Sequence, residues 1–483
     1  MHYQTTDQLV TALQKRQISS LELVDSAIAR ISTHDERWNA VIVRDFDRAR
    51  EQARAADRAL AKGDDKPLLG IPMTVKEAFD VSGLPTTWGI PGTESDPVAD
   101  DAVVVKRLKA AGAIVLGKSN VPLMLSDWQS SNEVYGVTNN PWDVTRTPGG
   151  SSGGSAAALA AGYVPLELGS DIAGSLRAPA HFCGVFAHKP THGLAPLQGI
   201  APPGGPRLSV TPFIDLIVVG PMARSANDLM LALDVTAGPG EANAVAYRLE
   251  LPPPRHTRLQ DFRVLVVNHH PLLPTESAIH SALDSVCDRL QKAGCRLGRA
   301  SPLLPDLAQI GKVYLELLMS HRSSEMPQAA YLQAQERAAL VAPADPTLAA
   351  ISSRSVALPH RNWILADQAR ALLAHQWREC FREWDVVLSP VMPTVAFPHD
   401  HRDMAERHIL VDGRPVPYGD QPMWASMATL TGQPATAMPI GLSLEGLPIG
   451  MQILGPYLED RTTLTFAHLV ERELGGFVAP PAP

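Results

Sequence analysis

Two short turns rich in serine and glycine lie 24 residues apart, counted from Ser151 to Ser175. The first reads GGSSGGS from Gly149, and the second reads SDIAGS and ends at Ser175. Glycine lets the backbone turn sharply and approach a bound group closely. A serine hydroxyl attacks a carbonyl carbon or relays a proton. Two such turns, folded back on each other, predict a nucleophile and its proton relay.

The second turn, Ser170–Ser175, has small residues before its last serine. Small side chains leave successive backbone N–H groups uncovered, and donors aimed at one point form an oxyanion hole. Ser175 would then lie beside that hole, as a nucleophile must. The alternative is a helix cap or tight turn without chemistry, since serine and glycine favour both.

The first turn excludes several glycine-rich motifs. A phosphate-binding loop ends in Gly-Lys-Ser/Thr, but Gly154 is followed by Ser155. A nucleophile elbow matches formally at Gly150, Ser152 and Gly154, yet it requires a strand immediately before it. Residues 141–148 are rich in turn formers, which argues against that strand and against a dinucleotide fingerprint. A proton relay and a flexible linker remain.

A hydroxyl nucleophile needs a base, and the residues alone leave several candidates open. A histidine base requires an orienting carboxylate, whereas a lysine serves where burial depresses its pKa toward neutrality. Lys76 ends an apolar strand, where burial would favour this role, although such a lysine is ordinarily a solvated strand end. The other candidates are Lys118, Lys189, His181, His188 and His192.

Alternating helical and strand patterns predict an α/β architecture that positions these groups. Helical patterns cover residues 6–32, with Thr6 as the cap, and 44–61, 101–111, 155–161, 276–293 and 461–474. Strand patterns cover residues 71–75, 113–116, 164–168, 262–267 and 386–388, although Pro165 weakens the third. A strand therefore leads to Lys76, and the first turn lies at the N-terminus of an alanine-rich helix.

Composition excludes several functional classes. The 483 residues are 45% hydrophobic and 19% charged, with a formal net charge of −8 and no long Lys/Arg run, so neither nucleic acid nor a membrane is expected as a partner. The four scattered cysteines indicate reduced, buried thiols rather than a zinc site or a disulfide framework. The N-terminus lacks a signal-peptide pattern and no apolar run could span a bilayer, which predicts a cytoplasmic protein.

Several motifs together resemble the amidase signature family. They are GIPMTVKEAFD, GGSSGGS and DIAGSLR, with further matching stretches at 139–150, 182–193, 220–235, 389–394 and 432–459. The resemblance implies a single α/β/α domain over residues 1–483, with a large twisted mixed central sheet covered by helices. Its signature core would span 67–235, a more variable part 240–385 and a C-terminal part 386–478, with the proline-rich stretch 251–254 as a candidate subdomain boundary.

The resemblance also implies a Ser–cisSer–Lys triad. Ser175 corresponds to the nucleophile, Ser151 to the bridging serine, whose peptide bond is expected to be cis, and Lys76 to the base. Ser152 corresponds to a supporting residue. Asp171 and Arg177 would orient the second turn, Ser170–Ser175, which we call the nucleophile turn after the predicted role of Ser175, or they would form an ordinary structural ion pair. The oxyanion hole would consist of the backbone N–H groups of Ile172, Ala173, Gly174 and Ser175.

Ala173 departs from the family pattern, because many members have glycine there. If the position requires a positive φ, alanine is strained. The additional methyl group could also narrow the acyl pocket. Neither effect removes a member of the triad.

The predicted function is hydrolysis of a carboxylic amide through an acyl-enzyme on Ser175, with no metal or organic cofactor. Met124, Leu125 and Trp128 are candidate substrate-binding residues, together with Leu123, Met423 and Trp424; their alternative is ordinary core. An apolar pocket would favour aryl or alkyl amides as the small-molecule substrate.

Four alternatives stay open. A carbamate hydrolase (urethanase) or an esterase would share the chemistry. The A subunit of a glutamyl-tRNA amidotransferase is less favoured, because residues 126–136 are not typical of that branch. A non-catalytic binding protein would have lost a triad residue, and none is missing. A homodimer is an open alternative to a monomer.

Overall fold

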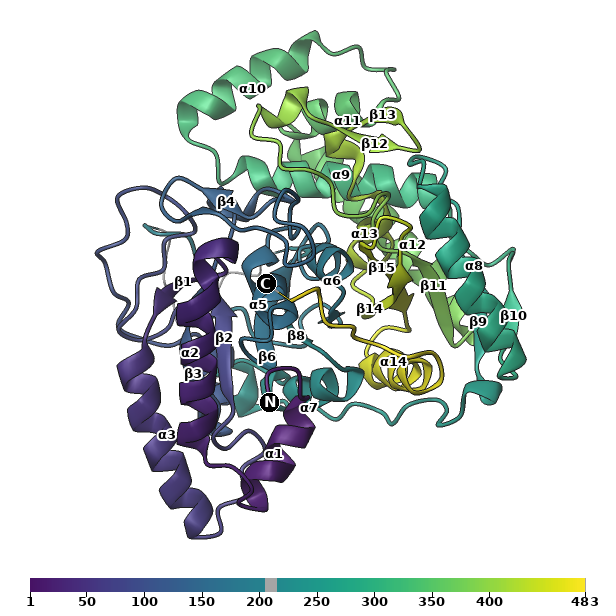
Figure 1. Ribbon diagram of the computed structural model, residues 1–483. Helices are drawn as coiled ribbons and strands as arrows, with labels where there is room; N and C mark the ends of the chain where they lie inside the picture. Colours follow the sequence, from purple (N-terminus) through teal and green to yellow (C-terminus); the bar gives the residue numbers. More distant parts are fainter. Residues whose placement is uncertain (205–214, 483) are drawn as a thin grey trace.

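A mixed sheet of 11 strands forms the centre of the structure, a computed structural model that describes residues 1–204 and 215–482 (Figure 1). The strand order is β1-β3-β2-β6-β8-β7-β14-β15-β11-β9-β10. β2 pairs in parallel with β3 and β6, and β9 with β10 and β11; the other neighbours are antiparallel. The strands are β1 (Val41–Arg44), β2 (Pro72–Lys76), β3 (Ile114–Ser119), β6 (Leu166–Asp171), β7 (Phe186–Lys189), β8 (Val218–Ala223), β9 (Arg263–Val266), β10 (Arg296–Gly298), β11 (Val386–Pro390), β14 (Ala435–Leu442) and β15 (Pro448–Leu454).

Helices cover both faces of this sheet, although α10 (Gln328–Leu340) packs on α11 (Leu348–Ser355) and lies away from the sheet (Figure 1). They are α1 (Thr6–Gln14), α2 (Ser20–Trp38), α3 (Phe46–Ala61), α4 (Val103–Ala110), α5 (Gly153–Ala160), α6 (Arg177–Cys183), α7 (Ala226–Thr236), α8 (Ser277–Lys292), α9 (Leu307–Ser323), α10 (Gln328–Leu340), α11 (Leu348–Ser355), α12 (His360–Glu383), α13 (Met423–Thr429) and α14 (Asp460–Leu474). One hydrophobic cluster joins the sheet to α4, α7, α8 and α14, and we call this side the α7 face. Two further clusters join the opposite side, the α5 face, to α2, α3, α5 and α6 and to α9, α11, α12 and α13. The three layers confirm the predicted α/β/α fold class.

Successive side chains of a strand point to opposite faces, and this alternation places Lys76. Met73 and Val75 of β2 belong to the cluster of the α7 face. Thr74 and Lys76 therefore point toward the α5 face, although all five residues of β2 are buried. The base candidate thus lies on the side of the sheet where α5 begins.

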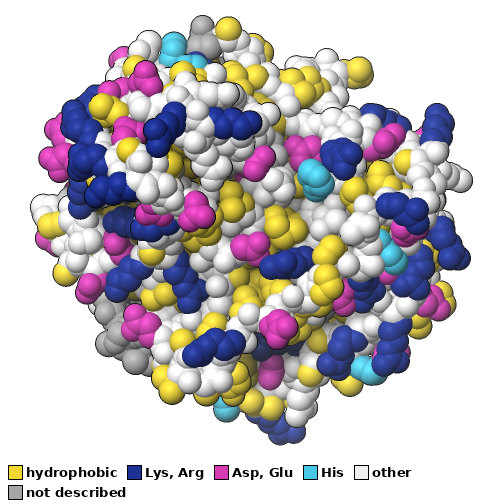
Figure 2. All heavy atoms as spheres, turned by 90° about the horizontal axis from the view of Figure 1, so that it is seen from below, with side chains coloured by type: hydrophobic (Ala, Val, Ile, Leu, Met, Phe, Trp, Pro, Cys, Tyr) yellow, Lys and Arg dark blue, Asp and Glu magenta, His cyan; other side chains and the backbone are white. Residues whose placement is uncertain are grey.

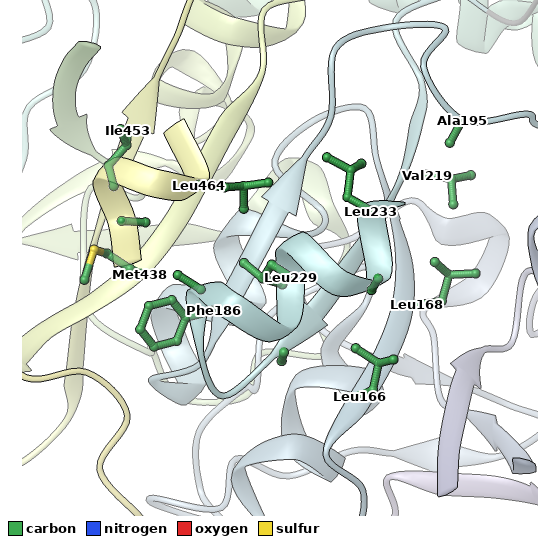
Figure 3. Packing of buried hydrophobic residues seen from close by; sticks show 14 of the residues in the cluster. Leu166, Leu168, Phe186, Ala195, Val219, Leu229, Leu233, Met438, Ile453 and Leu464 are labelled. Atoms are coloured by element: carbon green, nitrogen blue, oxygen red, sulfur yellow. The ribbon is translucent and has the colours of Figure 1, made fainter. Parts of the chain in front are cut away.

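The core beneath α7 shows how apolar residues distant in sequence meet (Figure 3). Leu229 and Leu233 of α7 lie over Leu166 and Leu168 of β6 in this cluster, together with Val219 of β8. All five side chains are almost completely buried. This packing fixes β6, the strand that leads into the nucleophile turn.

The helix α5 starts at Gly153, two residues earlier than predicted. All of its residues are buried, and most are alanine or glycine. A Cβ atom on Gly154 would lie 2.3 Å from the backbone nitrogen of Asn120, closer than any side chain tolerates. The glycines therefore let the start of α5 approach the chain beyond β3, which brings the first turn down onto the sheet.

The single helix predicted over residues 6–32 is wrong, because the structure has α1 and α2 instead. Ser19 caps α2: its Oγ accepts the N–H of Glu22 (3.1 Å), and the Glu22 carboxylate accepts the N–H of Ser19 (2.8 Å). Thr5, not Thr6, caps α1 in the same way through Gln8. A reciprocal cap satisfies N–H groups at a helix start, so each pair defines a separate helix.

The strand predicted over residues 164–168 is shifted: β6 starts at Leu166, after Pro165, and continues to Asp171. Proline lacks the N–H that a central strand needs, which explains the later start. The later elements that were predicted follow their predictions closely, and they are β9, α8, β11 and α14. β9, which follows residues 251–254, joins the same sheet as β2.

Four further observations complete the description of the fold. No helix in the described ranges combines the length and the apolar character needed to cross a bilayer. The face drawn in Figure 2 shows basic and acidic side chains interspersed rather than gathered by sign. All four cysteines are buried and free of disulfide bonds.

Two small hairpins in the described residues lie outside the main sheet. They are β4 (Ser131–Asn132) with β5 (Gly136–Val137), and β12 (His408–Val411) with β13 (Arg414–Pro417).

Candidate active site

The structure brings Lys76 and Ser151 into direct contact. Lys76 ends β2, and its Nζ donates to Ser151 Oγ over 2.6 Å. Ser151 lies in the loop before α5, and the Gly150–Ser151 peptide bond is cis, as the family resemblance implies. Both side chains are buried. An amine and a hydroxyl 75 residues apart in the chain therefore form the first link of the predicted relay.

Burial gives the Lys76 amine the properties of a base. Removal from water disfavours the ammonium form and lowers the pKa of Lys76 to about 7, although the negative charge of Asp171 opposes this shift. At neutral pH a large fraction of the amine is therefore uncharged. An uncharged amine accepts a proton, and a pKa near the working pH is the value that suits a general base.

Ser170 is a contact of this base that the sequence analysis did not identify. Its Oγ accepts a second hydrogen bond from Lys76 Nζ, over 2.9 Å. Ser170 lies on β6, which pairs in parallel with β2, so the register of the two strands brings it to the amine. Its position five residues before Ser175 was visible in the sequence, but no spacing rule connects it with Lys76.

Ser175 follows β6 at the end of the second turn and is 6% exposed. Its carbonyl accepts the backbone N–H of Ser152 over 3.2 Å. Ser152 also donates through its Oγ to the carbonyl of Ser170 (3.4 Å). The two serine turns are thus bonded to each other, and Ser152 is the residue that joins them.

The nucleophile turn offers three open backbone donors rather than the four expected. The N–H of Gly174 donates to Asp171 Oδ1 over 2.9 Å and is therefore already engaged. In the described part of the chain, the N–H groups of Ile172, Ala173 and Ser175 donate to no protein group. The predicted oxyanion hole loses Gly174 as a donor because the carboxylate at the start of the turn takes its proton.

Ala173 fits this turn without backbone strain. Among the described residues, the non-glycine positions with positive φ do not include Ala173. The positive φ lies at the next residue, Gly174 (+90°), where a Cβ atom would also meet Ala425 Cβ at 3.3 Å. The turn requires glycine at position 174, whereas position 173 tolerates a side chain.

Asp171 and Arg177 form a buried, bidentate ion pair. Arg177 Nη2 lies 2.9 Å from Asp171 Oδ1, and Nε lies 3.0 Å from Oδ2. The same carboxylate accepts the N–H groups of Gly174 and Leu176. Burial alone would raise the pKa of Asp171, but the guanidinium charge and its hydrogen bonds lower it to about 2. The carboxylate therefore stays ionised and holds the turn at two points.

The candidate pocket residues separate into different environments. Trp128 is tied to the nucleophile turn: its Nε1 donates to the carbonyl of Ala173 over 3.0 Å. Met423 and Trp424 are fully buried in the cluster under α9, α12 and α13, which favours their interpretation as core. Leu123 is 49% exposed. Met124 and Leu125 both have a positive φ (53° and 55°), a strained conformation that concentrates at functional sites.

The other candidate bases have different partners. Lys118 contacts Glu77 (3.4 Å), and His188 lies between Asp460 (3.1 Å) and Thr436 (2.9 Å). Burial lowers the pKa of His181 to about 4, and its ring contacts backbone groups. Burial and the charge of Arg177 lower the pKa of Lys189 to about 7, but its amine donates to the carbonyl of Pro190 (3.0 Å). Lys76 is thus the candidate whose contacts with serine hydroxyls the structure records.

Comparison with known proteins identifies the class. The family model described as Amidase matches residues 22–464, so the chain belongs to the amidase family. The family prediction from the serine turns is confirmed. Amide hydrolysis is the activity that this membership supports.

Three relatives illustrate the range within that class. The chain is 33% identical to the A subunit of the glutamyl-tRNA(Gln) amidotransferase of Anaeromyxobacter sp. (strain K), over 96% of this chain and 95% of the relative. One solved structure is described as a vestigial protein complex that reveals the evolutionary origins of an s-triazine catabolic enzyme. A chain of it is 28% identical to this protein, with a TM-score of 0.81 over 99% of this chain and 100% of that one. A bacterial aryl acylamidase shares the fold, at 23% identity and a TM-score of 0.81, over 98% and 97% of the two chains.

Proposed function

We propose that this protein hydrolyses carboxylic amides with an apolar aryl or alkyl acyl group, through an acyl-enzyme on Ser175. The observation that carries the proposal is the 2.6 Å contact between a buried amine of lowered pKa, Lys76, and the hydroxyl of Ser151. A lysine in this state replaces the histidine of other serine hydrolases as the proton acceptor.

The reaction follows from the order of these groups. Uncharged Lys76 accepts a proton from Ser151, which accepts one from Ser175 as its Oγ attacks the carbonyl carbon. The negative charge that develops on the carbonyl oxygen is stabilised by the open N–H groups of the nucleophile turn. The relay then returns the proton to the leaving amine, and water cleaves the acyl-enzyme by the same route.

Ser170 orients the base. An uncharged amine has two N–H donors and one lone pair, and a donor bond to Ser170 Oγ (2.9 Å) occupies one of the former. The charged amine donates to Ser151; in the uncharged amine this contact reverses, and the lone pair accepts the hydroxyl proton of Ser151. Without the bond to Ser170, the long side chain of Lys76 would have to adopt this orientation from among several rotamers before each reaction.

The surroundings of the turn support an apolar acyl group. Ile172 and Trp128 pack against the hydrophobic cluster under α9, α12 and α13. The neighbouring charges satisfy each other: Asp171 pairs with Arg177, and the carboxylate of Asp127 accepts from Arg407 and from the Tyr418 hydroxyl (2.6 Å). Paired charges attract a charged substrate less than free ones do.

A hydrolysis screen tests the proposal and separates it from its variants. Aryl amides, aliphatic amides, lactams, carbamates and esters are offered to the wild-type protein, with Ser175→Ala as the blank. We expect turnover of aryl or alkyl amides and a loss of about 10⁴-fold or more in the variant, which retains its fold. Turnover that survives in Ser175→Ala contradicts the assignment, and a preference for carbamates or esters redefines the substrate class.

A second candidate is an amidotransferase component, which the 33% identity to the glutamyl-tRNA(Gln) amidotransferase relative over 96% of the chain favours. Such a protein would release ammonia from glutamine and pass it to a partner. The test is glutaminase activity and glutamine-dependent transfer after co-expression with the partner subunits. Failure to react with a fluorophosphonate, a reagent for activated serines, would instead favour a non-catalytic binding protein.

A further inference from the structure

The carbonyl groups of the nucleophile turn are held from outside by donors. The hydroxyl of Tyr314, on α9, donates to the carbonyl of Ile172 over 2.8 Å. The N–H of Ala178, in the first turn of α6, donates to the carbonyl of Gly174 over 2.7 Å. Trp128 Nε1 donates to the carbonyl between them, that of Ala173.

The planarity of the peptide group links these contacts to the oxyanion hole. In a trans peptide, the C=O of one residue and the N–H of the next point in opposite directions. Gly150–Ser151 is the cis peptide bond recorded in the described residues, so the peptides of this turn are trans. A donor that holds the carbonyl of Ile172 therefore fixes the direction of the Ala173 N–H, one of the open donors.

Tyr314 and Trp128 differ in what their contacts control. The peptide that Tyr314 holds ends in the open N–H of Ala173. The peptide that Trp128 holds ends in the N–H of Gly174, which Asp171 already accepts. Loss of the Tyr314 contact releases a donor of the oxyanion hole, whereas loss of the Trp128 contact loosens a peptide that remains held at its other end.

We infer that Tyr314 is a positioning residue for the oxyanion hole, which it controls through the Ile172–Ala173 peptide. The inference rests on the proposed function, because it assigns a task within that reaction. A donor on a carbonyl also polarises the peptide and strengthens its N–H as a donor, by roughly 10–30% per bond. A preorganised donor stabilises the developing oxyanion without reorganisation at the moment of reaction.

The environment keeps the Tyr314 hydroxyl in its donor form. The residue is fully buried on α9. Burial, reinforced by the negative charge of Asp171, raises the pKa of Tyr314 far above its ordinary value. The phenol therefore remains protonated throughout the pH range in which Lys76 titrates.

The test compares Tyr314→Phe, which removes the hydroxyl and keeps the ring, with Tyr163→Phe as control. Tyr163 is a second buried tyrosine, which packs against Trp38 (ring centroids 5.8 Å) and has no recorded hydrogen bond to the turn among the described residues. The probes are 4-nitrophenyl acetate and 4-nitroacetanilide for turnover, and phenylboronic acid, whose serine adduct is a tetrahedral anion that resembles the intermediate. Circular dichroism and thermal unfolding verify the fold of each variant.

We expect Tyr314→Phe to lower kcat about tenfold, less than the loss of a whole oxyanion donor, with KM changed less than about twofold. Binding of phenylboronic acid should weaken by a similar factor, and Tyr163→Phe should match the wild type. An unchanged kcat and boronic acid affinity, a loss confined to KM, or an equal loss in Tyr163→Phe overturns the inference.

Two further arms keep the test decisive. If Tyr314→Phe does not fold, the tyrosine at position 314 is replaced by 3-fluorotyrosine, which keeps the contact with Ile172 and is a stronger hydrogen-bond donor. Tighter binding of phenylboronic acid to this protein supports the inference. Unchanged or weaker binding overturns it. If the wild-type protein neither hydrolyses the probes nor reacts with a fluorophosphonate, the proposed function fails and the inference with it. If the wild type reacts and the Tyr314 variant equals it, the positioning role alone fails.

Discussion

The groups that carry out the proposed chemistry and the groups that hold them come from two regions of the chain. The amine and hydroxyls of the relay all lie between residues 67 and 235, on β2, β6 and the two serine turns. Further support comes from beyond residue 240: Tyr314 donates to the Ile172 carbonyl of the nucleophile turn. The guanidinium of Arg177, which pairs with Asp171, donates to acceptors on the same later part of the chain, and they are Ala425, Thr429 and Gln452.

The reactive side chains and the groups that hold them in a fixed orientation therefore have partly different origins in the chain. The neighbouring strands β2 and β6 bring Lys76 and Ser170 within hydrogen-bonding distance, and the loop before α5 adds the hydroxyl of Ser151. Several distant elements are needed to fix the direction of a few backbone donors. Substitution of the base or the nucleophile should therefore abolish activity, whereas substitution of a group that orients the base or the turn should reduce activity in graded steps.

The largest expected effect tests the base in the first region. Lys76→Met should lower kcat/KM about 10⁴-fold at pH 7, because Lys76 is the group that accepts the Ser151 proton in the proposed reaction. In the wild type, kcat/KM should rise with pH and level off above about 7, since the amine of Lys76 must lose its proton before it can act. The measurement is a pH profile with a chromogenic amide, and the rising limb should vanish in the variant.

Lys189→Met is the matched control for this profile. It removes another buried amine, whose pKa is also lowered to about 7, but one that donates to the carbonyl of Pro190. We expect the rising limb to persist in this variant. Loss of the limb in Lys189→Met and its survival in Lys76→Met would show that the base is the other lysine.

The next effect tests the ion pair that connects the turn with the later part of the chain, because Arg177 binds Asp171 and also donates to groups after residue 240. Arg177→Met leaves Asp171 buried without its cation, which should lower the free energy of unfolding by about 3–5 kcal/mol. Denaturant unfolding measures this loss. Arg258→Ala, which breaks the exposed pair with Asp261, should leave the midpoint unchanged. Equal midpoints for the Arg177 variant and the wild type would contradict a structural role for the buried pair.

A smaller effect tests the orientation of the base. Ser170→Ala removes one acceptor from Lys76 and should lower kcat about tenfold, the value of one hydrogen bond, with KM unchanged. Ser119→Ala removes another buried hydroxyl, which contacts Ser155 over 2.8 Å, and should leave kcat as it is. Steady-state kinetics with both variants distinguish the two sites, and identical kcat values would remove Ser170 from the relay.

The smallest expected effect concerns the comparison of the two side chains that donate to carbonyl groups of the turn, Trp128 and Tyr314. Trp128→Phe removes the donor to Ala173, but Asp171 still holds the same peptide, so we expect kcat to fall only about threefold. Trp377→Phe, in the buried core of α12, is the control for loss of an indole. A loss larger than that of Tyr314→Phe would reverse the proposed order of the two contacts.

Local signals in the chain were sufficient for much of the framework. Apolar runs and alanine-rich stretches predicted β2, β9 and α5, because period and propensity act over a few residues. The break between α1 and α2 was missed although Ser19 and Glu22 form a capping pair three residues apart. A cap is a local feature too, so this error came from following hydrophobic periodicity alone across residues 15–19.

The sequence by itself determined the family and indicated Lys76, Ser151 and Ser175 as the triad. These residues lie in short motifs whose residue types and order are visible without knowledge of the fold. Tertiary structure alone decided that Ser170 meets the amine, that Asp171 takes the N–H of Gly174, and that Tyr314 holds the Ile172 carbonyl. These contacts depend on strand register and on the packing of a helix 142 residues downstream in the chain. No spacing rule specifies them, because their energy depends on distances that exist only after the sheet and its helices have assembled.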